Sequence, residues 1–414
     1  MPKDLTDVSQ WDTVAVPVGT DPATASSVET PIQLLTDRSR FLLDRISRMI
    51  PANFRPMNNS FSADVVPHWA DGRIIACHDQ KWGTHLLVVS ESIAAPSLKV
   101  LHSDGNGTWR NKETIGGVNG AAVAEDGDDD HAGRVTIVCS TGPNFIKDAV
   151  YTSLDGAAFS LVTITGTPGL NFQRIGCDKA ASPTWIIGDK VSSGSPSLYS
   201  STNGTTYSVV SGFPTVTSAQ DILDIQHTCH HAGALGPSDP GNARWLVITP
   251  DYAFRSTDGA TWFYQSHGLS IAIASHRKIA YSRTSQRWVA VTSVAGQVAY
   301  SDDHGATWTT IAGALGTSIG ERIVSDGHGT FVVQAGDGDR TTSYARAIYI
   351  SVDEGLTWTR HYVSHIGTIP YGTLRDLMSF GLYDMDETPD SVQGYLFADY
   401  DSGTEEHKQW ISHG

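Results

Sequence analysis

The sequence is poor in cysteine and in charged residues, and it has no apolar run of membrane-spanning length. Its four cysteines lie far apart, in or beside apolar runs, so we expect small buried thiols and no disulfide framework. Charged residues make up 17% of the 414 residues and give a net charge of −16, which argues against nucleic acid and anionic membranes as partners. The polar, acidic start Met1–Gln10 predicts no signal peptide, and no membrane insertion is expected. The cysteines are Cys77, Cys139, Cys177 and Cys229.

Glycine is abundant, with 40 residues, which suits many short strands joined by tight turns. The motif Ser-x-Asp-(x)-Gly-x-Thr-Trp recurs about fifty residues apart and predicts a tight turn between two strands. In such a turn the Asp side chain accepts hydrogen bonds from backbone N–H groups, Gly takes a positive φ, and the aromatic ring fills the layer beneath. The clear copies are Ser256–Trp262, Ser301–Trp308 and Ser351–Trp358, the weaker ones are Ser153–Phe159 and Ser201–Tyr207, and a degenerate one is Ser103–Trp109. The residues expected to shape these turns are Asp155, Asn203, Asp258, Asp303, Asp353, Trp262, Trp308 and Trp358.

This motif resembles the Asp-box, or BNR repeat, of sialidase-like β-propellers. The resemblance implies an all-β propeller, in which blades of short strands surround a central axis. Because the box is a structural turn, the resemblance implies almost nothing about chemistry.

A second repeat lies between the boxes and consists of an aromatic or bulky residue followed by aliphatic residues. Seven such strands against six boxes predict a seven-bladed propeller over residues 57–414, and six blades, as in the sialidases that the chain resembles, is the alternative. Trp410–Ser412 matches the approach to a seventh box, so we expect a strand around Asn58–Val66 to complete the last blade and close the ring. The repeated strands are His85–Val88, Val135–Val138, Trp185–Ile187, Trp245–Val247, Trp288–Ala290, Phe331–Val333 and Tyr395–Phe397.

The first fifty residues have a different character. Residues 1–29 are polar and predict an extended arm, and residues 30–56 predict a short helix and linker, with Thr30 as N-cap, Pro31 at the first helical position and Pro51 at the end. Apolar residues at heptad spacing favour a short parallel bundle, and a helix docked on its own propeller is the alternative. The heptad residues expected at the oligomer seam are Ile32, Leu35, Leu42, Ile46 and Met49.

Trp11-Asp12 followed by Pro31–Arg45 resembles the N-terminal attachment region of bacteriophage tail-fibre proteins, in which an arm precedes a Leu-x-x-Arg-(Ser/Thr)-x-(Phe/Tyr)-Leu helix. The resemblance covers about forty residues and implies a virion component, synthesised in the host cytoplasm and usually trimeric. It implies that residues 1–50 bind tail or baseplate proteins and hold a homotrimer. The expected function is therefore receptor binding by a phage tail, or by a tail-derived injection system.

The order of strands in a blade predicts which face meets the receptor. The box joins the third and fourth strands, so all boxes share one face, and a stalk that enters from that face leaves the opposite face for the receptor. We expect aromatic side chains on this distal face to stack on the sugar rings of host surface glycans. The candidates are Trp69, Phe145, Phe172 and Tyr371.

Two groups of residues have the composition of metal sites. Asp126, Asp128 and Asp130 carry carboxylates at alternate positions, as calcium ligands do, but the segment lacks the other residues of a calcium loop and favours a solvated hairpin. His227, Cys229 and His231 point to one side of a strand, as zinc ligands do, without an evident fourth ligand nearby. We expect neither metal nor cofactor.

Because sialidases share the Asp-box, a glycoside hydrolase on the virion is one alternative function, and a structural tail or baseplate protein is another. Phe54-Arg55-Pro56 drops one residue from the Phe/Tyr-Arg-Ile-Pro motif of the enzymes that it resembles. Arg174, Arg277 and Arg322 begin inner strands and are candidates to line a channel, but they do not assemble into a recognisable triad. The sequence therefore favours a binding protein over an enzyme, and assigns no catalytic residue.

Overall fold

The computed structural model divides the chain into two compact units, residues 1–50 and 51–414. It describes residues 54–56, 60–61, 75–79, 84–90, 97–103, 108–116, 127–129, 134–139, 148–154, 158–166, 172–178, 183–189, 195–216, 220–228, 245–271, 278–282, 284–325, 329–337, 346–362, 373–381, 393–401 and 406–413, with side chains only within 114–360. The predicted arm, helix and heptad positions lie outside these residues.

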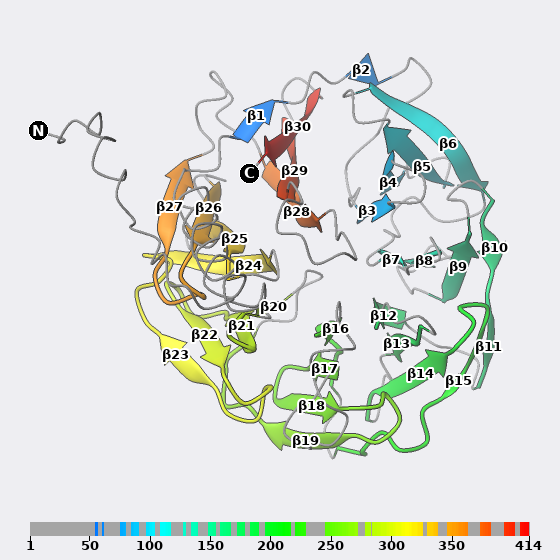
Figure 1. Ribbon diagram of the computed structural model, residues 1–414, viewed down its shortest axis with the longest axis horizontal. Helices are drawn as coiled ribbons and strands as arrows, with labels where there is room; N and C mark the ends of the chain where they lie inside the picture. Colours follow the sequence, from blue (N-terminus) through cyan, green and yellow to red (C-terminus); the bar gives the residue numbers. More distant parts are fainter. Residues whose placement is uncertain are drawn as a thin grey trace, which may run out of the picture. The chain divides into compact units, whose positions relative to one another are not determined.

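The described strands form seven sheets of four or five strands, numbered here sheet 1 to sheet 7 along the chain (Figure 1). Sheet 1 holds β3 (Ile75–Asp79), β4 (Thr84–Ser90), β5 (Ser97–Ser103), β6 (Thr108–Gly116) and β2 (Ser60–Phe61). Sheet 2 holds β7 (Gly127–Asp129), β8 (Val135–Cys139), β9 (Ala149–Ser153) and β10 (Ser160–Leu161). Sheet 3 holds β12 (Phe172–Cys177), β13 (Trp185–Asp189), β14 (Ser197–Ser201), β15 (Thr206–Val209) and β11 (Thr163–Thr165).

The remaining sheets follow the same order of strands. Sheet 4 holds β16 (Asp224–His227), β17 (Trp245–Ile248), β18 (Tyr252–Ser256) and β19 (Phe263–Ser266). Sheet 5 holds β20 (Ile279–Ser282), β21 (Arg287–Val291), β22 (Val298–Ser301) and β23 (Thr309–Ile311). Sheet 6 holds β24 (Ser318–Ser325), β25 (Phe331–Asp337), β26 (Arg346–Ser351) and β27 (Thr359–Tyr362). Sheet 7 holds β28 (Thr373–Gly381), β29 (Gln393–Asp401), β30 (Glu406–His413) and β1 (Phe54–Pro56).

The first strand of each sheet lies at the inside of a ring. The strands β3, β7, β12, β16, β20, β24 and β28 contact one another in turn, and β28 contacts β3, so the described sheets close on themselves (Figure 1). A closed ring hides the flat faces of the sheets against their neighbours and leaves only the short outer strands as edges.

An N-terminal strand completes sheet 7, but it is not the strand that the sequence predicts. Phe54 pairs with Ser412 and Pro56 with Trp410, so β1 takes the fourth position beside β30. The prediction that a strand around 58–66 does this is wrong, because Ser60–Phe61 pairs in parallel with β6 of sheet 1. An outer strand needs hydrogen bonds on one side alone, which suits a segment ending in proline, since proline has no N–H to donate.

The predicted apolar triplets are the second strands of the sheets. Trp185, Trp245 and Phe331 each open such a strand and Trp288 is the second residue of one, and each is at most 2% exposed. In the sheets whose side chains are described, the second strand is paired on both sides and packed on both faces, which explains a nearly continuous apolar run. These residues form the core between neighbouring sheets.

The Ser-x-Asp turns join third and fourth strands, as the motif predicts. In sheet 4 the Asp258 carboxylate accepts hydrogen bonds from the N–H groups of Ala260 at 2.9 Å and Thr261 at 2.7 Å, while Gly259 has φ +72°. The Trp262 indole N–H donates to the Gly259 carbonyl at 3.0 Å, and its ring is buried. Asn203, Asp303 and Asp353 accept the corresponding bonds in sheets 3, 5 and 6, whereas Asp155 lies outside the described residues.

Each turn also locks its sheet to the preceding one. A Cβ atom on Gly305 of sheet 5 would lie 2.8 Å from Leu246 Cδ1 of sheet 4, and one on Gly355 of sheet 6 would lie 2.8 Å from Val289 Cγ2 of sheet 5. Glycine is therefore required at these positions both for its positive φ and for the close contact between sheets.

Candidate functional site

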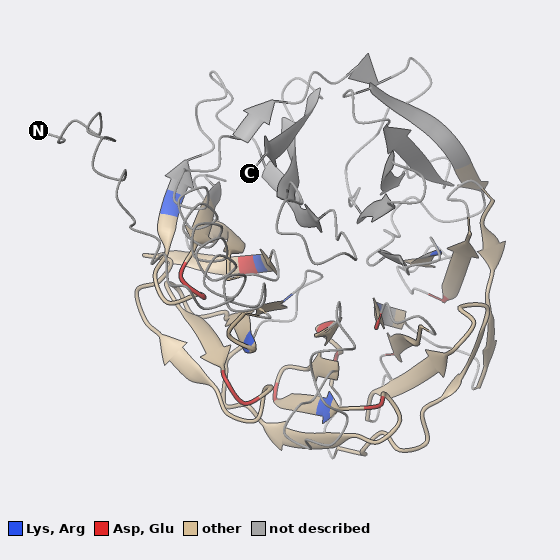
Figure 2. Ribbon diagram, in the orientation of Figure 1, with Lys and Arg blue, Asp and Glu red and all other residues tan. Residues whose placement is uncertain are grey.

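Charged residues at or next to the inner strands link sheet 3 to sheet 4, sheet 4 to sheet 5 and sheet 5 to sheet 6. Figure 2 shows charged positions of the ribbon near the inside of the ring. The Arg174 guanidinium of β12 donates from Nε to the Leu223 carbonyl, just before β16, at 2.7 Å. Asp224 of β16 accepts at Oδ2 from the backbone N–H of Lys278, just before β20, at 2.6 Å. The Lys278 ammonium in turn donates to the Glu321 carbonyl of β24 at 2.7 Å. Equivalent positions in successive sheets thus tie neighbouring inner strands together.

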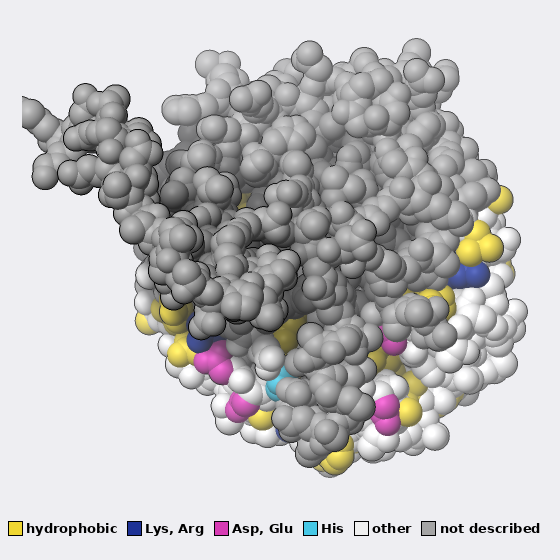
Figure 3. Space-filling model, in the orientation of Figure 1, with side chains coloured by type: hydrophobic (Ala, Val, Ile, Leu, Met, Phe, Trp, Pro, Cys, Tyr) yellow, Lys and Arg dark blue, Asp and Glu magenta, His cyan; other side chains and the backbone are white. Residues whose placement is uncertain are grey.

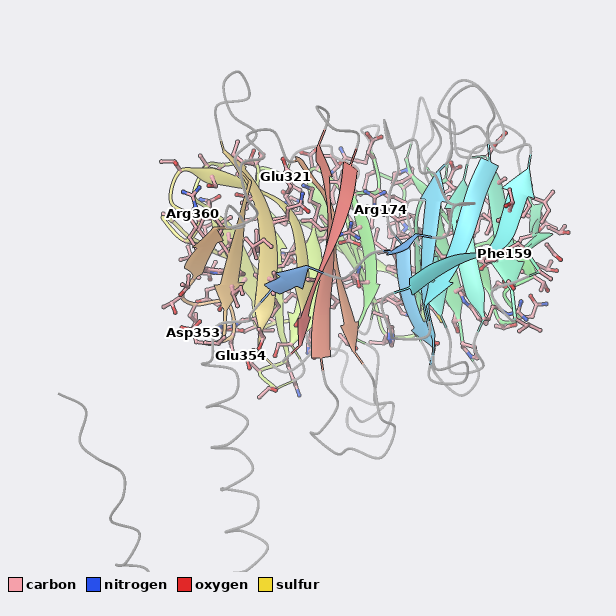
Figure 4. The ribbon with its side chains drawn as sticks, turned by 90° about the horizontal axis from the view of Figure 1, so that it is seen from above. Phe159, Arg174, Glu321, Asp353, Glu354 and Arg360 are labelled. Carbon is pink, nitrogen blue, oxygen red and sulfur yellow. The ribbon has the colours of Figure 1, made fainter. Side chains whose placement is uncertain are left out.

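This charged cluster lies at the end of the ring opposite the Ser-x-Asp turns. Arg174, Asp224 and Lys278 stand near the starts of first strands, while the turns follow third strands, which run in the same direction as first strands. Figure 4 shows Arg174 and Glu321 toward one end of the ring, and Asp353 with its neighbour Glu354 toward the other.

The cluster is buried. Asp224 is 1% exposed, Arg174 and Lys278 are 3% exposed, and Arg322 is 5% exposed. Burial lowers the pKa of Lys278 to about 8; the negative charge of Glu321 opposes that shift, and the positive charge of Arg174 adds to it. An ammonium with a lowered pKa that donates to a backbone carbonyl fits a structural connection between sheets rather than a surface that captures ligands.

The sequence identified only part of this cluster. Arg174 and Arg322 are on inner strands as predicted, whereas Arg277 lies outside the described residues and its neighbour Lys278 occupies the connecting position. Asp224 and Lys278 were missed. The available signal was a charged residue followed by isoleucine in or just before the first strands of sheets 3 to 6, at Arg174, Asp224, Lys278 and Arg322.

The predicted glycan-binding aromatics receive one correction. Phe172 is 1% exposed and packs edge-to-face against Tyr199, with ring centroids 6.1 Å apart, so its prediction as a distal binding residue is wrong. Its register on β12, opposite Asp189 of β13, turns it into the core of sheet 3 instead of leaving it in a loop. Trp69, Phe145 and Tyr371 lie outside the described residues.

The two candidate metal sites are not assembled in the described part of the chain, which holds no cluster of three or more metal-ligating side chains. Gly127–Asp129 form β7, which pairs antiparallel with the next strand, β8, and this pairing fits the predicted hairpin. Asp126 and Asp130 lie outside the described residues. The His227 ring packs against Trp245, with centroids 4.6 Å apart. Cys229 and His231 are not described, and Cys177 is a free buried thiol, as predicted.

Sheet 4 carries a group of aromatic side chains that reaches from the core to the outer edge of the ring. Phe254 is fully buried and contacts Phe213, with ring centroids 4.7 Å apart, while Tyr264 of the outer strand stacks on Phe254 at 5.6 Å. Tyr264 is 45% exposed and Phe263 is 66% exposed. Figure 3 shows hydrophobic side chains on the outer edge of the ring at the bottom of the view, where β18 and β19 lie in Figure 1. No helix within the described residues is long and apolar enough to span a bilayer.

No protein-family model and no curated protein matches the sequence. Among solved structures the fold is similar to YCF48 from Cyanidioschyzon merolae, with 12% identity and a TM-score of 0.53 over 87% of this chain and 98% of that one. Two further matches are weaker. YCF48 bound to D1 peptide has 14% identity and a TM-score of 0.43 over 66% of this chain and 78% of that one. A GH74 enzyme of Niastella koreensis has 15% identity and a TM-score of 0.27 over 79% of this chain and 53% of that one. The first likeness identifies an all-β propeller fold in the described part of the chain, and at this identity it carries no information about activity.

Proposed function

We propose that this chain is a receptor-binding protein of a phage tail or of a tail-derived injection system. Residues 1–50 attach it to tail or baseplate proteins as a homotrimer, and its propeller presents the end opposite the turns to host surface glycans. The observation that carries the proposal is the tail-fibre-like segment Trp11-Asp12 and Pro31–Arg45 in one chain with a propeller. On this proposal the protein is located in the tail of the virion.

The propeller in this proposal has seven blades, which correspond to sheets 1 to 7, and its repeated turns are Asp-boxes. The closed succession of first strands from β3 to β28 supports the count, and the hydrogen-bonded Asp or Asn in sheets 3 to 6 supports the assignment of the turns. Repeated rigid blades suit a tip that presents loops and edges to a large surface.

Binding is favoured over hydrolysis by the hydrogen bonds of two acidic residues on described inner strands, Asp224 and Glu321. Glycoside hydrolysis requires two carboxyl groups facing the scissile bond, one of them a proton donor. Asp224 is 1% exposed and accepts from the N–H groups of Lys278 and Ile279 and from Gln226 Nε2. Glu321 accepts from Gln334 Nε2 at 3.3 Å. These contacts give both acids structural roles.

The mass of the protein in solution tests the attachment half of the proposal. The full chain is expected to be a trimer at micromolar concentration, and a chain starting at Pro51, which keeps β1, is expected to be a monomer with the same strand content. A monomeric full chain, or a trimer that survives removal of residues 1–50, would overturn the assignment of these residues as the trimeric attachment region.

A further inference from the structure

Tyr264 of the outer strand β19 and Tyr252 of the neighbouring strand β18 form an aromatic shelf in sheet 4, defined here as Tyr252, Tyr264 and the buried Phe254. The Tyr264 ring stacks on Phe254 with an interplanar angle of 24°, and it meets the Tyr252 ring at 75° with centroids 5.6 Å apart. The register places all three on one face of the β18–β19 pair, because Tyr264 lies opposite Phe254, and Tyr252 is two residues before Phe254. The two tyrosine rings, inclined to each other at 75°, therefore form the two walls of a corner.

The corner is accessible and has hydrogen-bonding capacity. Tyr264 is 45% exposed and Tyr252 is half-buried. Neither phenol hydroxyl makes a hydrogen bond with the residues that the structure describes, so each retains a donor and acceptor for a ligand. The buried side of the shelf is rigid, since Phe254 is also packed against Phe213 at 4.7 Å.

The fold does not require tyrosine at these positions. Tyr264 pairs with Phe254, which lies two positions before the turn serine Ser256. In the other sheets whose side chains are described, we therefore compare the outer-strand residue that pairs with the residue two positions before the turn serine. Aliphatic, polar and charged residues all serve there, and none of the residues equivalent to Tyr252 is aromatic. The equivalents of Tyr264 are Leu161, Val209, Thr310 and Arg360, and those of Tyr252 are Ala149, Ser197, Gln297 and Ala347.

We propose that the shelf binds a neutral sugar ring of a glycan. Tyr264 stacks on the C–H face of the sugar, and the Tyr252 hydroxyl hydrogen-bonds to a ring substituent. A neutral sugar is favoured because the chain carries a net charge of −16 and the nearby cation Arg255 lies opposite Phe263, on the other face of the strand pair. Asp251, next to Tyr252, already accepts from Gln220 Nε2 at 2.7 Å. The inference deepens the proposed function, on which its biological role as receptor contact rests.

Tyr264→Leu is the variant that tests the shelf, because leucine is the natural residue at the equivalent position of sheet 2. Phe263→Leu is its matched control, since Phe263 is more exposed, at 66%, and faces the other way. Titration calorimetry on the full chain measures binding of two groups of probes. The first group is neutral tri- and tetrasaccharides of glucose, galactose and N-acetylglucosamine, and the second is uronic acid trisaccharides. At least one neutral probe is expected to bind with a Kd of about 1 mM or lower.

For that probe, Tyr264→Leu is expected to weaken binding about tenfold, and Tyr252→Phe a few-fold, while Phe263→Leu changes it less than twofold. Equal losses in Tyr264→Leu and Phe263→Leu, a preference for the uronic acids, or no binding of any neutral probe at 10 mM would overturn the inference. Melting temperatures separate loss of binding from loss of folding. The trimer mass, which tests the proposed function, does not depend on Tyr264. The shelf and the proposed function can therefore fail separately.

Discussion

The Asp224 carboxylate of sheet 4 caps the first strand of sheet 5 at Lys278, with Oδ2 2.6 Å from the Lys278 backbone nitrogen. The same oxygen lies 3.0 Å from the backbone nitrogen of Ile279, so one buried acid satisfies two donors of a neighbouring sheet. Asp224→Ala is expected to lower the free energy of unfolding by about 3 kcal/mol, because it leaves both N–H groups without an acceptor in the interior. Asp224→Asn, which keeps one acceptor oxygen, is expected to lose less.

Chemical denaturation at neutral pH measures both variants. A loss below about 1 kcal/mol for Asp224→Ala would contradict the role of Asp224 as a connection between sheets.

Lys278 gives the protein a stability that rises with pH in the alkaline range. Burial lowers its pKa to about 8 in the folded protein, whereas the unfolded chain has the ordinary lysine value near 10.4. Between these values the unfolded state binds more protons than the folded state, so the free energy of unfolding increases as pH rises, by on the order of 3 kcal/mol from this group. Lys278→Met should abolish that increment. Chemical denaturation of the wild type and of Lys278→Met from pH 7.5 to 10 measures this increase in the free energy of unfolding. Parallel pH profiles of the two proteins would contradict the contribution of Lys278.

A comparison of Gly305 with Gly313 separates the two reasons for glycine in a Ser-x-Asp turn, which are the positive φ and the close contact with the preceding sheet. Both have positive φ, +85° and +80°, but a Cβ on Gly305 would lie 2.8 Å from Leu246, whereas a Cβ on Gly313 would meet nothing within 4 Å. Gly313→Ala should therefore destabilise by about 1 kcal/mol, from backbone strain alone, and Gly305→Ala by about 2–4 kcal/mol. Thermal and chemical unfolding compare them. Equal effects would show that the turn does not lock sheet 5 to sheet 4.

Asn203 is a natural test of whether the turn needs a charge. Its side-chain oxygen accepts from Thr205 and Thr206 at 2.9 Å each, as Asp258 does from Ala260 and Thr261. Asp258→Asn should therefore be nearly neutral at pH 7, while Asp258→Ala should destabilise by about 1–2 kcal/mol.

The pH dependence of Asp258 follows from its hydrogen bonds. Burial raises the pKa of this carboxyl, but hydrogen bonds from Thr261, Ala260 and Ser256 outweigh burial and leave the pKa below its usual value. Its contribution to stability is therefore complete above about pH 4 and is lost as pH falls below that value. Any advantage of the wild type over Asp258→Asn should shrink between pH 5 and pH 3, and an advantage that grows on acidification would contradict this.

The turns and second strands were predictable because their causes are local. A side chain that bonds to backbone two to four residues away, or an apolar run opened by tryptophan, is visible in the sequence itself, as at Asp258 and Trp245. The connection from Asp224 to Lys278 could not be predicted from the sequence, because it joins residues of different sheets. Phe172 was misassigned because its glycine- and proline-rich approach resembles an exposed loop, whereas its burial follows from its pairing with β13. The shelf was missed because neither Tyr252 nor Tyr264 lies in a loop.

Electron cryo-microscopy of the intact particle that carries this protein tests the central claim most directly. The account expects three copies at the end or side of a tail, held through residues 1–50, with the propeller end opposite the turns facing solvent. A propeller enclosed on that end by neighbouring subunits, or a protein that is absent from purified particles, would contradict the claim that the chain is a receptor-binding protein of a tail.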